Sequence, residues 1–335
     1  MKRKSIFCLL CLSLFVCLFC SPRADAQVDA HFSQYYAYPL WLNPGLTGVM
    51  DGDYRITANY KRQWAAVTSP FTTEALSFDT YPYKHLGLGA TILNQSAGDG
   101  GYNYINGMFS AAYRAILDEK GINVLSIGLQ AGVMNRRFNP NKLAFGSQYS
   151  PILGYNPATP SGEDFDKTSA TAFDANFGIV YFNGNPNTRM NPFGGVSVYH
   201  LSRPQDPFLT TGSRRLPMRM NVHGGVRIKL NEQFNLTPQA IYIRQGNAHE
   251  LTMGAYLQYL LPDYSDFLFG ATFRANDAVI PFVGFHLGDY TFGLSYDVNV
   301  SELKSASQGR GGIELSLSYI RHKKMHDPRF ICPRL

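Results

Sequence analysis

The chain has 335 residues, of which only 16% are charged, while 14% are aromatic. Soluble domains carry roughly 25% charged residues, so an ordinary soluble β-protein is disfavoured and a membrane protein is favoured. The formal net charge of +6 falls to +3 without residues 1–26, since that stretch holds four basic residues and one acidic residue. Nucleic acid is therefore not an expected partner.

Residues 1–26 have the organisation of a signal peptide. Lys2, Arg3 and Lys4 precede an apolar stretch, and Ala24-Asp25-Ala26 forms an A-x-A cleavage site. The sequence therefore predicts an exported protein whose mature chain begins at Gln27. Lipid attachment at Cys20 is the weaker alternative, because bulky Phe19 precedes it where a small residue is expected.

The mature chain offers neither a disulfide nor a helical membrane span. Four of the five cysteines lie in residues 1–26, so only Cys332 remains and an internal disulfide is excluded. No apolar run of about 18 residues follows the signal peptide. Two fates remain for such an exported chain, a soluble secreted or periplasmic β-protein and an outer-membrane barrel.

Residues 27–52 precede the first predicted strand and are interpreted as an N-terminal plug or cap. Pro39 and Pro44 interrupt this segment and prevent both a continuous strand ladder and a long helix.

From residue 53 to residue 321 the sequence alternates in the manner of β-strands, as in "YTFGLSYDVNVS" (290–301), where apolar and polar residues alternate strictly. About fourteen strands are predicted. They lie near 53–62, 73–81, 85–94, 102–115, 121–133, 170–182, 191–203, 217–230, 234–244, 249–260, 266–274, 278–287, 289–301 and 311–321.

The connections between these strands alternate in length. Those at 82–84, 118–121, 231–233, 261–266 and 288–289 are short, and that at 183–190 is intermediate. The connections that alternate with these along the chain are long at 63–72, 95–101, 134–169, 204–216 and 302–310, and short at 245–248 and 275–277. An outer-membrane barrel has short periplasmic turns and longer outer loops. The pattern therefore predicts an all-β, transmembrane, antiparallel barrel with both termini periplasmic, its apolar faces toward lipid and its polar faces toward the lumen.

The sequence shows no catalytic or metal-binding motif. The histidines lack metal-ligand spacing, there is no G-x-S-x-G elbow, and the glycine-rich stretches at 87–90, 98–101 and 309–312 precede no predicted helix. We therefore expect a protein that is not an enzyme and that uses no metal and no cofactor. A Ser/His pair at one rim stays open as the enzymatic alternative.

Three stretches together resemble one known family. They are "HFSQYYAYPLWLNPGLTG" (31–48), "YDVNVSELKSASQGRGGIELSLSYI" (296–320) and the final "CPRL". The chain resembles the PorP/SprF family of outer-membrane proteins of the Bacteroidetes type IX secretion system, which is linked also to gliding motility. The resemblance covers the mature chain, and its opening and closing motifs are the specific part.

The resemblance implies a non-enzymatic barrel in contact with outer-membrane lipid, with periplasmic secretion-ring or motor proteins, and with a large secreted cargo or adhesin. The candidate plug and partner contacts that it implies are His31, Phe32, Ser33, Gln34, Tyr35, Tyr36, Pro39, Asn43, Pro44, Cys332, Pro333 and Arg334. Residues 322–335 are expected to form a periplasmic tail, either solvated or docked on an acidic partner. A channel or solute transporter is the alternative function, and it depends on whether residues 27–48 and 134–169 fill the lumen.

Overall fold

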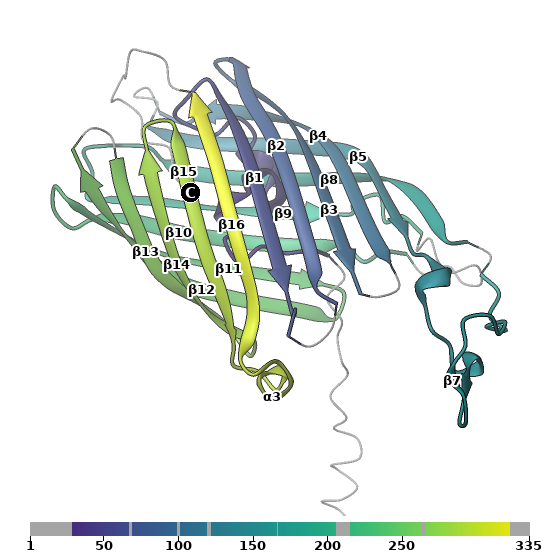
Figure 1. The fold of residues 1–335 in the computed structure, drawn as a ribbon. Coiled ribbons are helices and arrows are strands. Elements are labelled where there is room, and N and C mark those ends of the chain that lie inside the picture. Colours follow the sequence, from purple (N-terminus) through teal and green to yellow (C-terminus); the bar gives the residue numbers. More distant parts are fainter. Residues whose placement is uncertain are drawn as a thin grey trace, which may run out of the picture.

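The computed structural model describes residues 29–66, 69–98, 101–118, 122–165, 167–205, 215–262 and 265–321. Fourteen antiparallel strands close into a barrel in which β1 pairs with both β2 and β16 (Figure 1). The barrel strands are β1 (Tyr54–Gln63), β2 (Phe71–Tyr83), β3 (Leu86–Ala97), β4 (Tyr102–Ile116), β5 (Asn123–Arg137), β8 (Ser169–Asn183), β9 (Met190–Tyr199), β10 (Arg219–Lys229), β11 (Phe234–Gln245), β12 (Ala248–Leu261), β13 (Ser265–Arg274), β14 (Ala278–Leu287), β15 (Tyr290–Asn299) and β16 (Arg310–Arg321). The predicted fold and its fourteen strands are confirmed.

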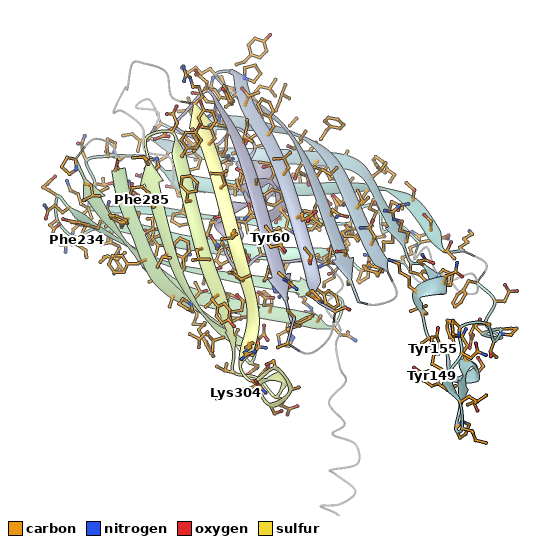
Figure 2. All side chains as sticks on the ribbon, in the orientation of Figure 1. Tyr60, Tyr149, Tyr155, Phe234, Phe285 and Lys304 are labelled. Atoms are coloured by element: carbon orange, nitrogen blue, oxygen red, sulfur yellow. The ribbon has the colours of Figure 1, made fainter. Side chains whose placement is uncertain are left out.

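The apolar faces of the strands point outward and the polar faces point inward, as the alternation predicted. On β15, Leu294 is 40% exposed whereas its neighbour Ser295 is 2% exposed. Figure 2 shows the same outward direction for Tyr60 and Phe285. An exposed apolar band around a closed barrel is the surface that lipid covers.

The short and long connections lie at opposite rims of the barrel. The rim of the short connections includes the β14–β15 turn and the last residue of β16, Arg321. Aromatic rings gather there, with Tyr319 packed 4.9 Å from Tyr290 and 6.0 Å from Tyr54 between ring centroids. This placement is that of the interfacial aromatic girdle of membrane barrels.

The long connections contain structure that the alternation did not reveal. Between β5 and β8 an arm projects away from the barrel and holds η3 (Pro140–Lys142), η4 (Gly146–Gln148) and the two-residue strands β6 (Tyr149–Ser150) and β7 (Gly154–Tyr155) (Figures 1 and 2). A short helix, α3 (Leu303–Ser307), lies between β15 and β16. None of the helices in the described ranges is long and apolar enough to cross a bilayer.

Two strand ends differ from the prediction by four residues. β5 continues to Arg137 rather than residue 133, because β8 pairs with it along its whole length. β9 ends at Tyr199 rather than residue 203, because His200 and Arg203 have φ values of 60° and 44°. Left-handed backbone is incompatible with continued strand geometry.

The N-terminal residues from Asp29 onward lie inside the barrel, where Figure 1 shows them in purple behind the front strands. They include η1 (Tyr35–Ala37), α2 (Pro39–Leu42) and η2 (Pro44–Leu46). Asp29 contacts Arg219, the first residue of β10, at the rim of the long connections. Gly52 approaches Arg321 at the rim of the short connections. The segment therefore crosses the lumen from one rim to the other.

This path bears on the expectation that both termini share one side of the membrane. The first and last residues of the chain lie outside the described ranges. Within them, Asp29 and Arg321 lie at opposite rims, because the N-terminal segment runs the length of the lumen before β1 begins. The described chain therefore begins and ends at different ends of the barrel.

Candidate functional site

The contact between the N-terminal segment (residues 29–50) and the lumen wall is the candidate functional site. All residues of the segment except His31 and Ala37 are buried. Local sequence explains its bends, because Pro39 begins α2 and Pro44 begins η2, both at positions where a missing N–H costs nothing. The Asn43 side chain caps η2 by accepting the Gly45 N–H at 2.8 Å.

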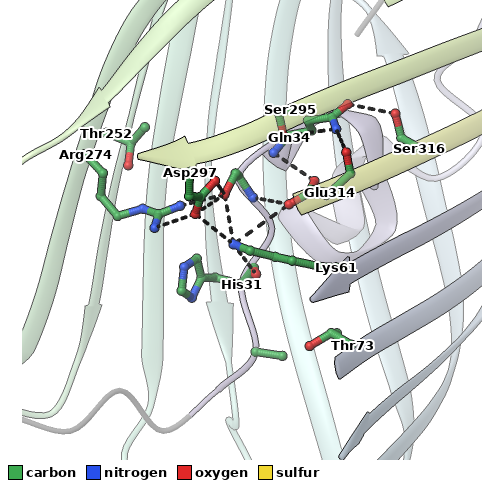
Figure 3. A network of polar contacts seen from close by, with 12 residues as sticks. His31, Gln34, Lys61, Thr73, Thr252, Arg274, Ser295, Asp297, Glu314 and Ser316 are labelled. Carbon is green, nitrogen blue, oxygen red and sulfur yellow. Dashed lines mark hydrogen bonds and ion pairs between the residues drawn. The ribbon is translucent and has the colours of Figure 1, made fainter. Parts of the chain in front are cut away.

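A buried group of charged side chains holds Ser33 and is called the central cluster (Ser33, Lys61, Arg274, Asp297 and Glu314), drawn in Figure 3. Glu314 accepts the backbone N–H of Ser33 at 2.7 Å and that of Gln34 at 2.9 Å. The Ser33 hydroxyl donates to Asp297 at 2.7 Å and accepts from Lys61 and Arg274, each at 2.8 Å.

The charges of the central cluster compensate one another inside the barrel. Lys61 lies 3.6 Å from Asp297 and 3.8 Å from Glu314, and Arg274 lies 3.2 Å from Asp297. Lys61 and Glu314 are both fully buried. Removing one partner of such a buried pair typically costs about 3–5 kcal/mol, because the other charge stays desolvated. The cluster therefore ties the segment to β1, β13, β15 and β16 at once.

Asn43 makes the second contact, with the opposite wall. Its Nδ2 donates to the carbonyl oxygens of Ile179 at 3.1 Å and Val196 at 3.2 Å, and lies 3.1 Å from Nε2 of His223. The other ring nitrogen of His223 lies 3.2 Å from the hydroxyl of Tyr36. Two residues of the segment thus share one histidine of β10.

Glycines of the strands make room for this segment. A Cβ on Gly178 would lie 2.0 Å from Oδ1 of Asn43, and one on Gly128 would lie 2.2 Å from the carbonyl oxygen of Pro44. A Cβ on Gly293 would lie 2.3 Å from Oε1 of Gln34. The inward glycines are therefore contact positions for the segment.

A third contact lies at the rim of the long connections and is called the rim cluster (Asp29, Arg136, Asp174, His200 and Arg219). His200 bridges two carboxylates, with Nε2 2.7 Å from Asp29 and Nδ1 2.6 Å from Asp174. Arg219 Nη1 lies 3.2 Å from Asp29, and Arg136 Nη2 lies 3.8 Å from it. These contacts fix the beginning of the described chain to β5, β8 and β10.

The rim cluster shifts the pKa values of its two groups outside the strands. Burial alone would lower the pKa of His200, but the carboxylates of Asp29 and Asp174 outweigh it and raise the pKa to about 9. Burial alone would raise the pKa of Asp29, but His200 and Arg219 outweigh it and hold the pKa well below its usual range. At neutral pH, His200 is therefore an imidazolium that donates to both carboxylates.

Aromatic residues support the rim cluster from the segment side. The guanidinium of Arg219 lies 4.1 Å from the ring centroid of Tyr199 and 4.8 Å from that of Trp41. Tyr199 donates its hydroxyl to the Trp41 carbonyl at 2.7 Å, and the Trp41 indole donates to the Ala30 carbonyl at 3.0 Å. Cation–π contact with a buried guanidinium adds to the ion pairs.

Every N-terminal candidate residue from Phe32 to Pro44 is buried in the lumen. His31 is half-buried, with Nε2 4.0 Å from Glu250. Cys332, Pro333 and Arg334 lie outside the described residues.

Sequence reasoning missed the wall partners of the segment, above all Lys61, His200 and His223. A signal was present for Glu314, which is a charged residue on a face of β16 that otherwise carries Gly312, Ser316 and Ser318. Among the described residues, no three His, Cys, Asp or Glu side chains are grouped so as to hold a metal ion.

Comparison with known proteins gives a family and a set of distant barrels. The family model described as "Type IX secretion system membrane protein PorP/SprF" matches residues 24–319. No curated protein matches the chain.

Solved structures similar to the chain include the CymD monoaromatic hydrocarbon channel, with 13% identity, a TM-score of 0.48, and coverage of 89% of this chain and 96% of that one. The deltaS2S3 mutant of the TodX monoaromatic hydrocarbon channel has 9% identity and a TM-score of 0.49, covering 88% and 95%. A FadL homologue of Pseudomonas aeruginosa has 10% identity and a TM-score of 0.47, covering 86% and 94%. These values are too low to carry a functional implication.

Proposed function

Since the chain belongs to the PorP/SprF family of type IX secretion system membrane proteins, we propose that it serves this machinery as a barrel plugged by its own N-terminal segment. In this proposal the protein performs no catalysis. It supports export or surface retention of a secreted cargo or adhesin, and it contacts periplasmic ring or motor proteins. In cells whose secretion machinery also powers gliding motility, it takes part in gliding.

The observation that carries the proposal is the attachment of the segment to the barrel wall at three depths. The rim cluster holds Asp29, the central cluster holds Ser33, and the wall opposite holds Asn43. A segment that is held by buried ion pairs at Asp29 and by hydrogen bonds to buried charged side chains at Ser33 is costly to displace. A scaffold for protein contacts needs no open passage, whereas a solute channel does.

The proposed orientation places the short connections in the periplasm, since barrels carry their short turns on that side. Arg321 then faces the periplasmic partners. We propose that the tail 322–335, which lies outside the described residues, offers its basic residues to an acidic surface on that side. Asp29 and the arm between β5 and β8 face the cell exterior, where cargo is retained.

The first experiment is deletion of the gene in its native host, with the secreted proteins and the partners of a tagged copy identified by mass spectrometry after mild-detergent purification. We expect loss or surface release of at least one large exported protein, and co-purification of periplasmic ring components. Unimpaired secretion together with recovery of the barrel alone would reject the proposal.

Ion conductance of the purified protein in planar bilayers separates the plugged scaffold from the channel. We expect little conductance from the full chain and a large increase when residues 29–50 are deleted. High conductance of the full chain would favour the channel.

A further inference from the structure

The strand β8 leaves one of its edges open near the rim of the long connections. It pairs with β5 along all of its length, from Ser169 to Asn183. It pairs with β9 only between Phe177 and Phe182, because the chain turns away after Tyr199. Within the described ranges, no strand pairs with residues 169–176 on the side opposite β5.

The direction of the backbone groups along this edge follows from its two neighbours. The carbonyl of Ala175 accepts the Leu201 N–H at 2.9 Å, and the carbonyl of Phe173 accepts the Ser202 hydroxyl at 3.1 Å, both on the open side. On the β5 side, Thr168 accepts the Phe138 N–H at 3.0 Å. Because backbone groups alternate sides along a strand, those of Ser169 and Thr171 point to the open edge.

This edge has none of the features by which proteins protect an unpaired strand. Residues 169–173 read "SATAF", without a proline, a charge or a bulge. In the described part of the β9–β10 connection, Ser202 bonds to the carbonyl of Phe173, and Pro204, Gln205 and Leu216 lie on the inner face at Ala170 and Ala172.

The outward side chains place the edge at the aqueous boundary of the barrel. Asn135 of β5 donates to the side chains of Ser169 at 3.2 Å and Thr171 at 2.9 Å. The same polar band continues onto β4, where Asn103 accepts from Arg137 at 3.1 Å. A hydrogen-bonded polar band on the outer face does not suit lipid, so the edge meets water at Ser169 and Thr171, whereas outward-facing Phe173 begins the apolar band.

We propose that the open edge of β8, from Ser169 to Phe173, binds an extended segment of a partner protein that adds as a further antiparallel or parallel strand. Alternating backbone donors and acceptors along one edge are matched by another extended polypeptide and not by lipid or sugar. Pro204, Gln205 and Leu216 already lie against inward-facing Ala170 and Ala172, so the incoming strand places small side chains on that face.

The charges around the edge define the partner further. Exposed basic residues near the edge are Lys167, two residues before the strand, and Arg203 and Arg215 of the β9–β10 connection. The exposed acids of the described neighbourhood are Glu163 and Asp164, in the arm. A strand flanked by acidic residues is therefore the complementary partner.

The test is peptide binding to the full chain purified in detergent, followed by fluorescence anisotropy. The probe is a synthetic peptide with an alternating Thr/Val core and two glutamates at each end, compared with the same core flanked by lysines. Thr171→Pro removes one N–H from the open edge while leaving the bonds to β5, and proline is tolerated at such edge positions. Thr171→Val is the matched control, since it removes the same hydroxyl but keeps the N–H.

We expect the glutamate-flanked peptide to bind with a Kd that rises about tenfold or more in Thr171→Pro and stays within about twofold of the unchanged protein in Thr171→Val. Binding should slow amide exchange at Thr171 and Phe173 but not at Ala170 and Ala172, since only the odd positions face the edge. If Thr171→Pro fails to fold, Ser169→Pro at the start of the strand carries the same test.

Three outcomes of the peptide test would overturn the proposal. They are no binding up to about 1 mM peptide, equal binding by Thr171→Pro, and equal binding of the lysine-flanked peptide. Self-association of the full chain that Thr171→Pro abolishes would also overturn it, because the edge would then belong to a second copy of the chain. None of these results bears on the role in secretion, which the deletion experiment tests separately.

Discussion

Ser33 and Glu314 are 281 positions apart in the sequence, and the backbone N–H of Ser33 donates to Oε2 of Glu314 at 2.7 Å. The second oxygen of the same carboxylate accepts the N–H of Gln34 at 2.9 Å. One side chain of the last strand thus binds two consecutive backbone groups of the N-terminal segment. This contact ties the two ends of the described chain together inside the barrel.

Replacing Glu314 tests how much the central cluster stabilises the segment. We expect Glu314→Gln to lower the free energy of unfolding by about 3 kcal/mol, because buried Lys61 keeps only Asp297 as its counter-charge and the N–H groups of Ser33 and Gln34 lose the carboxylate that accepts both. Thermal unfolding in detergent measures the change, and proteolysis between residues 29 and 50 should become faster. Glu302→Gln is the control, since Glu302 is exposed in a connection at the rim. Equal stability of the two variants would contradict the assigned role.

The rim cluster predicts a specific dependence of stability on pH. The pKa of His200 is about 9 in the folded protein, against 6.5 for the unperturbed side chain. The contribution of His200 to the free energy of unfolding is therefore complete below pH 6.5 and is lost as the pH rises through 9. The loss amounts to at most about 3 kcal/mol. Because the pKa of Asp29 is lowered, its contribution is present above pH 4 and is lost in acid.

Unfolding midpoints measured between pH 6 and pH 10 check this dependence, and we expect them to fall across that range. In His200→Gln the decrease should be much smaller, because the titrating group is absent. A variant with the same pH profile as the unchanged protein would show that another group is responsible.

The contact between Gly178 and Asn43 predicts that a single methyl group displaces the segment. In Gly178→Ala the new Cβ meets Asn43 Oδ1, so we expect a loss of about 1–3 kcal/mol of stability and a rise in bilayer conductance. Gly107→Ala is the matched control, since a Cβ there has no described atom within 4 Å. Unchanged conductance in Gly178→Ala would mean that the segment tolerates the displacement.

The outward direction of Leu294 predicts a penalty for charge at that position. Leu294→Arg places a charge in the apolar band and should cost about 2–4 kcal/mol, measured by unfolding in lipid. Leu153→Arg serves as the control, because Leu153 is 83% exposed at the tip of the arm. If both variants lost equal stability, the β15 outer face would not be the lipid-facing one.

The sequence by itself determined the fold of this protein, because the information is local. A strand such as β15 alternates over ten residues, so its two faces and its partner hairpins follow from nearby residues, whereas the exact strand ends do not. The alternation of short and long connections distinguished a barrel from a sandwich for the same reason. Family membership followed from motifs that lie close to the two ends of the chain.

Only the tertiary structure decided what fills the barrel. The polar face that carries Ser295 and Asp297 reads equally well as a water-lined wall or as a binding surface, because alternation does not identify what lies opposite. Lys61, Glu314 and Ser33 come from three distant parts of the sequence, and their charges compensate one another only after the barrel has closed. The open edge of β8 is equally non-local, since it depends on where a neighbouring strand ends.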